Sequence, residues 1–122
     1  MELTIEERDG IQLASISGEL DTFGAQSVRE ELGLVRSTER LVIDLSELAF
    51  VDSAGLHALF AVGRGAKDVG ARVAFVVPAS SPIRRVIELV HLADVSPVCD
   101  AVDQALERLR GGEEGFAPDP TG

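Results

Sequence analysis

The chain has 122 residues, of which 45% are hydrophobic and 26% are charged, and its formal net charge is −10. This composition fits one soluble domain. No uninterrupted apolar run is longer than that of residues 73–77, which is far too short to span a membrane. Because the negative charge repels phosphate backbones and anionic lipid headgroups, we expect neither a nucleic acid nor a membrane as partner.

Cysteine and histidine content argues against a structural metal site. Cys99 is the single cysteine of the sequence, so no intrachain disulfide can form, and no cysteine and histidine cluster has the spacing of a zinc site. The acidic N-terminus has no apolar segment of the kind that a secretion signal needs. We therefore expect a cytoplasmic protein with no metal ion and no cofactor, in which Cys99 is a small buried side chain.

The first part of the chain predicts a hairpin and a helix. Apolar and polar residues alternate over residues 2–6, which indicates a half-buried strand, and residues 11–16 predict a second strand. Asp9-Gly10 between them favours a tight antiparallel turn, because glycine accepts a positive φ. Residues 24–35 place their apolar side chains on one stripe, which predicts a helix.

The rest of the chain alternates between predicted strands and helices. The apolar runs at residues 41–43 and 73–77 are typical of interior strands that are covered on both faces, and residues 53–66 predict the helix between them. Residues 80–82 are expected to open a third helix with Pro82 in its first turn, and a short strand is expected near residues 95–98. A last helix is expected from its cap at Asp100 to Gly111-Gly112.

This order of elements predicts an α/β fold. We expect a mixed, mostly parallel sheet with an N-terminal antiparallel hairpin and about four helices, because strand–helix–strand units form right-handed parallel crossovers. Residues 1–110 are expected to form the domain. Residues 111–122 are rich in glycine, proline and acidic residues and are expected to form a disordered acidic tail.

The segment at residues 43–56 joins a buried strand to the helix that begins at Asp52-Ser53. Both side chains are good helix N-caps, and Ser53 could be no more than a cap. Asp52 could cap or touch a partner, and the same alternatives apply to Asp21 before the first helix. The small residues Ala54 and Gly55 are expected to leave the entrance of the helix open, so that another protein can reach the Ser53 hydroxyl.

Two motifs in the sequence resemble those of STAS-domain anti-sigma factor antagonists. Asp52-Ser53-Ala54-Gly55-Leu56 follows an apolar strand at a helix start, and Gly18-Glu19-Leu20-Asp21 is similar to the second motif of that family. Residues 81–85 and 91–92 resemble its third helix. Either motif alone is weak, but the two at this spacing are a fairly specific match over about residues 1–110, which implies a STAS-like sheet.

The resemblance implies a partner-switching cycle. The unphosphorylated form would bind an anti-sigma factor that is also a serine kinase, and a sigma factor would be released. The kinase would then phosphorylate Ser53 and dissociate, and a serine phosphatase would reset the switch. The family often has Ser or Thr where this chain has Ala54, so Ser53 is the only hydroxyl of the motif. The residues implied in partner binding are Asp21, Asp52, Ser53, Ala54, Gly55 and Leu56.

The chemistry of a phosphoserine agrees with such a switch. It adds about −1.5 to −2 charges, and a helix N-terminus tolerates an anion because of its free N–H groups and dipole. Beside Asp52, and near Asp21, the phosphate would create a dense negative patch. We therefore expect the fold to survive phosphorylation while docking fails.

Other functions have less support in the sequence. A hydrolase nucleophile elbow needs a glycine two residues before the serine, where this chain has Val51, so we expect no enzyme. His57 and His91 are interpreted as partly exposed helix residues, and Arg84-Arg85 as a solvated face. The alternative function is a stand-alone STAS subunit of a transport or stress-sensing complex.

Overall fold

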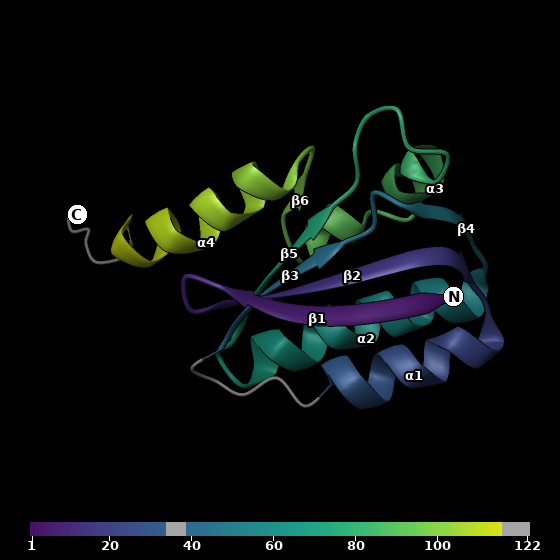
Figure 1. Cartoon of the computed structure of the whole chain (residues 1–122), viewed down its shortest axis with the longest axis horizontal. Helices are drawn as coiled ribbons and strands as arrows, with labels where there is room; N and C mark the ends of the chain where they lie inside the picture. The colour runs from purple at the N-terminus through teal and green to yellow at the C-terminus, as the bar shows by residue number, and fades with distance from the viewer. Residues whose placement is uncertain (34–38, 116–122) are drawn as a thin grey trace.

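A mixed sheet of six strands forms the centre of the computed structural model, which describes residues 1–33 and 39–115 (Figure 1). The strands are β1 (Glu2–Arg8), β2 (Ile11–Leu20), β3 (Arg40–Asp44), β4 (Leu48–Val51), β5 (Arg72–Val76) and β6 (Val98–Cys99). The helices are α1 (Thr22–Leu32), α2 (Ser53–Asp68), α3 (Arg84–Leu89) and α4 (Val102–Gly115), and a 3-10 turn, η1, spans Leu92–Asp94. The predicted α/β fold class is confirmed.

The order of the strands is β1-β2-β3-β5-β6, and β4 pairs with β2 outside this path. β1 runs antiparallel to β2, and the other pairings are parallel. Asp9 and Gly10 connect β1 to β2 with φ values of 53° and 79°, as the tight turn between paired Arg8 and Ile11 requires. The predicted hairpin is therefore confirmed.

The two continuous apolar runs are interior strands, as predicted. In β3, Leu41 and Ile43 face the core that includes α1 and α2, while Val42 faces the second core, beneath α4. β5 divides its side chains in the same way, with Phe75 on the first face and Ala74 on the second. Figure 1 shows α1 and α2 on one side of the sheet and α4 on the other. Both faces exclude water, which is why these strands read as unbroken apolar runs.

β4 is absent from the predicted elements, because residues 48–51 were expected to lie in a loop. The strand has only four residues, and its partner is the far end of β2, beyond an irregularity in pairing at Gly18/Glu19. Gly18 has a φ of 89°, which glycine adopts without strain. The sheet thus extends toward the start of α2 by a strand that local periodicity cannot reveal.

Several boundaries in the C-terminal half differ from the predictions. α3 begins at Arg84, after a turn in which the Ser81 hydroxyl accepts a hydrogen bond from the Ile83 amide at 3.2 Å. β6 follows the predicted position by a few residues, because η1 occupies residues 92–94. The predicted cap at Asp100 is wrong, since α4 starts at Val102 and the Asp100 carboxylate instead binds Arg84.

The expected helix end at Gly111-Gly112 is also wrong. α4 continues to Gly115, because the glutamates that follow the two glycines are good helix formers and interior glycine costs only about 1 kcal/mol. The first five residues of the expected tail are therefore helical. Residues 116–122, and the predicted end of the first helix at Val35, lie outside the described residues.

Candidate functional site

The ends of two parallel strands bring the starts of α1 and α2 together. β2 and β4 pair at their last residues, Leu20 and Val51, and an aspartate follows each strand directly. The Asp52 amide donates a hydrogen bond to the Leu20 carbonyl at 3.1 Å, which ties the two strand ends together. Asp21 and Asp52 therefore occupy corresponding positions at neighbouring helix N-termini.

Each of these aspartates caps its own helix, which confirms the capping interpretation of both residues. The Asp21 carboxylate accepts from the amides of Phe23 at 3.2 Å and Gly24 at 3.3 Å. The Asp52 carboxylate accepts from the Gly55 amide at 2.9 Å. In each carboxylate the oxygen that caps is Oδ1. The caps satisfy first-turn N–H groups and hold the start of each helix in place.

Ser53 is the first residue of α2, and it is exposed. The cap of the helix is Asp52, so the interpretation of Ser53 as a plain N-cap is wrong. Among the residues that the structure describes, the Ser53 hydroxyl has no hydrogen-bond partner. The hydroxyl is thus displayed to solvent at a fixed point of the fold, one residue beyond a capping carboxylate.

The expectation that Gly55 leaves the entrance of the helix open is wrong. Gly55 is buried, and a Cβ there would lie 2.6 Å from the Leu20 carbonyl oxygen and 2.8 Å from side-chain atoms of Leu20 and Val51. Glycine is needed because the backbone of α2 touches the ends of β2 and β4. Ala54 and Leu56 are half-buried and pack on the core.

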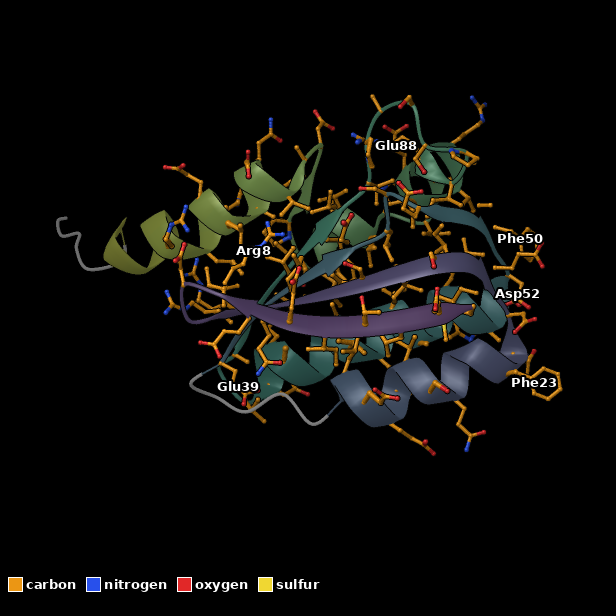
Figure 2. All side chains as sticks on the ribbon, viewed as in Figure 1. Arg8, Phe23, Glu39, Phe50, Asp52 and Glu88 are labelled. Carbon is orange, nitrogen blue, oxygen red and sulfur yellow. The ribbon has the colours of Figure 1, made fainter. Side chains whose placement is uncertain are left out.

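Two exposed phenylalanines flank this site and were not predicted as part of it. Phe23, in the first turn of α1, is 87% exposed, and Phe50, in β4, is 49% exposed. Figure 2 shows both rings and Asp52 at the same end of the molecule. Each ring is a large apolar side chain outside the core-facing side of its element. That position is the one signal of their role that the sequence contains.

A groove of about 710 Å³ runs along α2 from Ser53. From α2 it is lined by Ser53, Leu56, His57, Phe60, Ala61 and Arg64. Arg29 of α1 and Val90, which follows α3, complete the lining. We call this hollow the α2 groove. Its residues come from three segments far apart in the chain, so sequence periodicity could not have predicted it.

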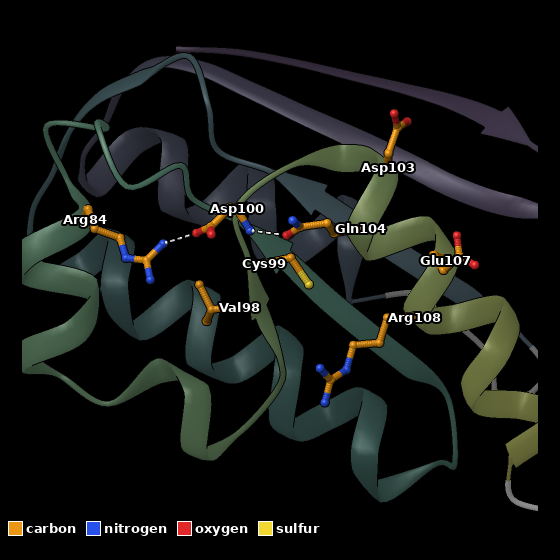
Figure 3. Close-up of a pocket in the computed structure, with 8 residues that line it drawn as sticks. All are labelled: Arg84, Val98, Cys99, Asp100, Asp103, Gln104, Glu107 and Arg108. Atoms are coloured by element: carbon orange, nitrogen blue, oxygen red, sulfur yellow. Dashed lines mark hydrogen bonds and ion pairs between the residues drawn. The ribbon is translucent and has the colours of Figure 1, made fainter.

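A second hollow, of about 760 Å³, lies between α3, β6 and α4 (Figure 3). Arg84 crosses it and donates to the Val77 carbonyl at 2.6 Å, to Asp100 at 2.8 Å and to Glu88 at 2.9 Å. The hydrogen bonds to Glu88 and Asp100 raise the pKa of the Arg84 guanidinium. Arg84 therefore joins the end of β5 to α3 and to the segment before α4, and the prediction of a simple solvated face holds only for the exposed Arg85.

Cys99, at the end of β6, lines the same hollow and is buried, as predicted. Burial raises the pKa of the Cys99 thiol, while the Arg108 guanidinium opposes that rise. Within residues 1–33 and 39–115, no group of three histidine, cysteine, aspartate or glutamate side chains could hold a metal ion. In the same part of the chain, no helix has the length and apolar character to cross a bilayer.

The family is decided by a match over most of the chain. The model of the STAS domain matches residues 2–105. The chain belongs to the STAS-domain family. The resemblance inferred from the motifs at residues 18–21 and 52–56 is therefore confirmed for the family, and the sheet described above is a STAS fold.

Two relatives are similar to the chain over most of its length, and a more distant structure shares its fold. It is 34% identical over 113 residues to the anti-sigma-F factor antagonist RsfB of Mycobacterium tuberculosis, and the match covers 90% of each chain. A crystal structure of an anti-sigma factor antagonist from Mycobacterium paratuberculosis is also 34% identical, with a TM-score of 0.73 over 89% of this chain and 93% of that one. The anti-sigma factor antagonist SpoIIAA in its unphosphorylated form, 20% identical, shares the fold with a TM-score of 0.67 over 90% of this chain and 99% of its own.

Proposed function

We propose that this chain is an anti-sigma factor antagonist whose activity is switched off by phosphorylation of Ser53. The observation that carries the proposal is the exposed Ser53 hydroxyl at the first position of α2, beside a capping aspartate that leaves it unbonded in the described structure. Relatives at 34% identity that are themselves anti-sigma factor antagonists support the same assignment.

The unphosphorylated protein binds an anti-sigma factor that is a serine kinase, and a sigma factor is released. In the transfer step, a bond forms between the Ser53 oxygen and the γ-phosphorus of ATP while the bond from that phosphorus to its bridging oxygen breaks. ADP leaves, and the hydroxyl proton passes to a base of the kinase. A serine phosphatase hydrolyses the phosphoserine and restores the binding form in the cytoplasm.

The domain tolerates the phosphate because of where it sits. The N-terminus of α2 carries partial positive charge and free first-turn N–H groups, which favour an anion. The core lies beneath Gly55 and Leu56 and is not displaced by a group added to an exposed hydroxyl. The phosphoserine therefore changes the surface and leaves the packing intact.

The position of the phosphate also explains why the partner can no longer bind. The partner packs over Ser53 and contacts Asp21, Asp52, Ala54 and Leu56, while Gly55 contributes by letting α2 approach the strands. The exposed rings of Phe23 and Phe50 are apolar anchors for this interface, since aromatic side chains, phenylalanine among them, are enriched in protein–protein interfaces. A dianion at Ser53 would have to be desolvated beside two carboxylates, which opposes association.

The alternative, a stand-alone STAS subunit of a transport or stress-sensing complex, makes no demand on an exposed, unbonded hydroxyl at this position. The exposure of Ser53 therefore favours the phosphorylated switch.

The test uses the purified chain and each candidate anti-sigma factor kinase encoded in the same genome. Incubation with ATP and magnesium, followed by tandem mass spectrometry, should place one phosphate on Ser53. Ser53→Ala should bind the kinase without being modified. Ser53→Asp should keep the circular dichroism of the wild type and bind at least about tenfold more weakly, an effect of about 1.4 kcal/mol.

Ser80→Asp is the matched control, because Ser80 is an exposed serine in the loop after β5 and the substitution adds the same charge. It should bind within about threefold of wild type, a difference under about 0.7 kcal/mol. If every kinase leaves Ser53 unmodified, the proposed function is wrong. If Ser53→Asp binds as tightly as wild type, the electrostatic account of the switch is wrong.

A further inference from the structure

The α2 groove begins at the proposed phosphorylation site and continues away from it along the helix. Ser53 lies at one end and Arg64 at the other, and their separation of eleven positions corresponds to about 16 Å of helix, or three turns. Leu56, Phe60 and Val90 are half-buried and supply apolar lining between these ends. This length and lining suit a helix laid along α2 with its apolar face toward the groove.

The groove also gathers positive charge in a chain whose net charge is −10. Arg29 and Arg64 both line it and are exposed, as is His57. In the described part of the chain, neither arginine forms an ion pair with a carboxylate, whereas Arg8, Arg84 and Arg110 each do. The Arg64 guanidinium instead lies 5.1 Å from the centroid of the Phe60 ring.

Guanidinium groups without an ion-pair partner, next to an apolar lining, favour a ligand that combines apolar and acidic side chains. Arginine binds carboxylates through paired N–H donors and keeps its charge at every physiological pH. The complementary ligand is therefore an amphipathic helix whose acidic residues lie near Arg29 and Arg64 and whose apolar residues contact Leu56 and Phe60. A basic helix would meet like charge at the same positions and is disfavoured.

We propose that the α2 groove receives an acidic amphipathic helix of the kinase that phosphorylates Ser53. This inference rests on the proposed function and adds the chemistry by which the partner is recognised. It also supplies a direct mechanism of release. The new dianion on Ser53 stands at the end of a groove occupied by an acidic helix, so repulsion within the complex adds to the cost of desolvation.

The test compares two double charge reversals in the full chain. Arg29→Glu/Arg64→Glu alters the groove, whereas Arg8→Glu/Arg108→Glu makes the same change in net charge at β1 and α4. Binding to the kinase that modifies wild-type Ser53 is measured by calorimetry at low and high salt. We expect the groove variant to bind at least about tenfold more weakly, an effect of about 1.4 kcal/mol, and the control to stay within about threefold. The loss should shrink at high salt, which screens exposed charges.

Two further variants make the result decisive. Arg29→Gln/Arg64→Gln removes the charges without reversing them and should weaken binding less than the double reversal, with an unchanged circular dichroism spectrum. Reversal of acidic residues in an amphipathic helix of the kinase to lysine should restore binding to Arg29→Glu/Arg64→Glu.

The possible failures are distinguishable. A kinase that phosphorylates Ser53 but binds both double reversals equally would overturn the groove proposal and leave the proposed function standing. If no kinase binds or modifies the wild-type chain, the proposed function fails and the inference fails with it.

Discussion

Substitution of Gly55 by alanine tests the contact that positions the start of α2. The added Cβ would lie 2.6 Å from the Leu20 carbonyl oxygen and 2.8 Å from atoms of the Leu20 and Val51 side chains. The side chains can shift, but the carbonyl oxygen is held by its hydrogen bond from the Asp52 amide at 3.1 Å. The clash therefore forces the helix start away from the strand ends.

The expected magnitude follows from two opposing effects. Overpacking a buried position costs about 1–3 kcal/mol, and a fixed main-chain atom places this case at about 3 kcal/mol. Alanine returns at most about 1 kcal/mol through its higher helix propensity. We expect Gly55→Ala to lower the free energy of unfolding by about 2 kcal/mol, which corresponds to a melting temperature lower by about 8 °C.

The assay is urea unfolding followed by circular dichroism, since the chain has neither tryptophan nor tyrosine for fluorescence. Gly65→Ala is the matched control, because it lies in the same helix and an added Cβ there would meet no atom within 4 Å. It should raise the free energy of unfolding by about 0.5–1 kcal/mol. If Gly55→Ala proves as stable as Gly65→Ala, the close approach of α2 to β2 described here is wrong.

The remaining predictions concern the cap of α2 and the buried thiol. Asp52→Ala should destabilise the domain by about 1 kcal/mol in urea titrations, because the Gly55 amide loses its acceptor, whereas Asp52→Asn should cost only a few tenths. Equal losses in the two variants would show that charge, and not capping, is what matters. Cys99 should react with a disulfide reagent more slowly in the folded than in the urea-unfolded chain at pH 8. Since burial raises the pKa of its thiol, its rate should begin to climb at a higher pH when folded. Equal native and unfolded rates would contradict that burial.

The parts of the fold that could be predicted are those governed by local pattern. The Asp9-Gly10 turn carries its own backbone preference, and residues 41–43 and 73–77 are apolar throughout because helices cover both faces of β3 and β5. β4 could not be predicted in this way. Its four residues form a strand only because the end of β2 extends far enough to pair with them.

The same division applies to the site. Asp21 and Asp52 were recognisable as possible caps, since capping depends on residues within one turn. The burial of Gly55 was not, because it depends on the backbone of Leu20, which lies 35 positions earlier in the numbering of the chain. The α2 groove likewise needs Arg29 and Val90, which only the tertiary structure brings to the side of α2.

Strand pairing and the cap at Asp52 determine where the Ser53 hydroxyl lies. Pairing of β2 with β4 and the amide of Asp52 hold the first turn of α2, and none of these contacts involves the outward side chains of Arg29, His57 or Arg64. Those three positions can therefore change identity without moving the Ser53 hydroxyl or disturbing the core. Under the proposed function, related proteins in one genome could therefore share the same helix start and differ at these three positions, so that each binds a different kinase.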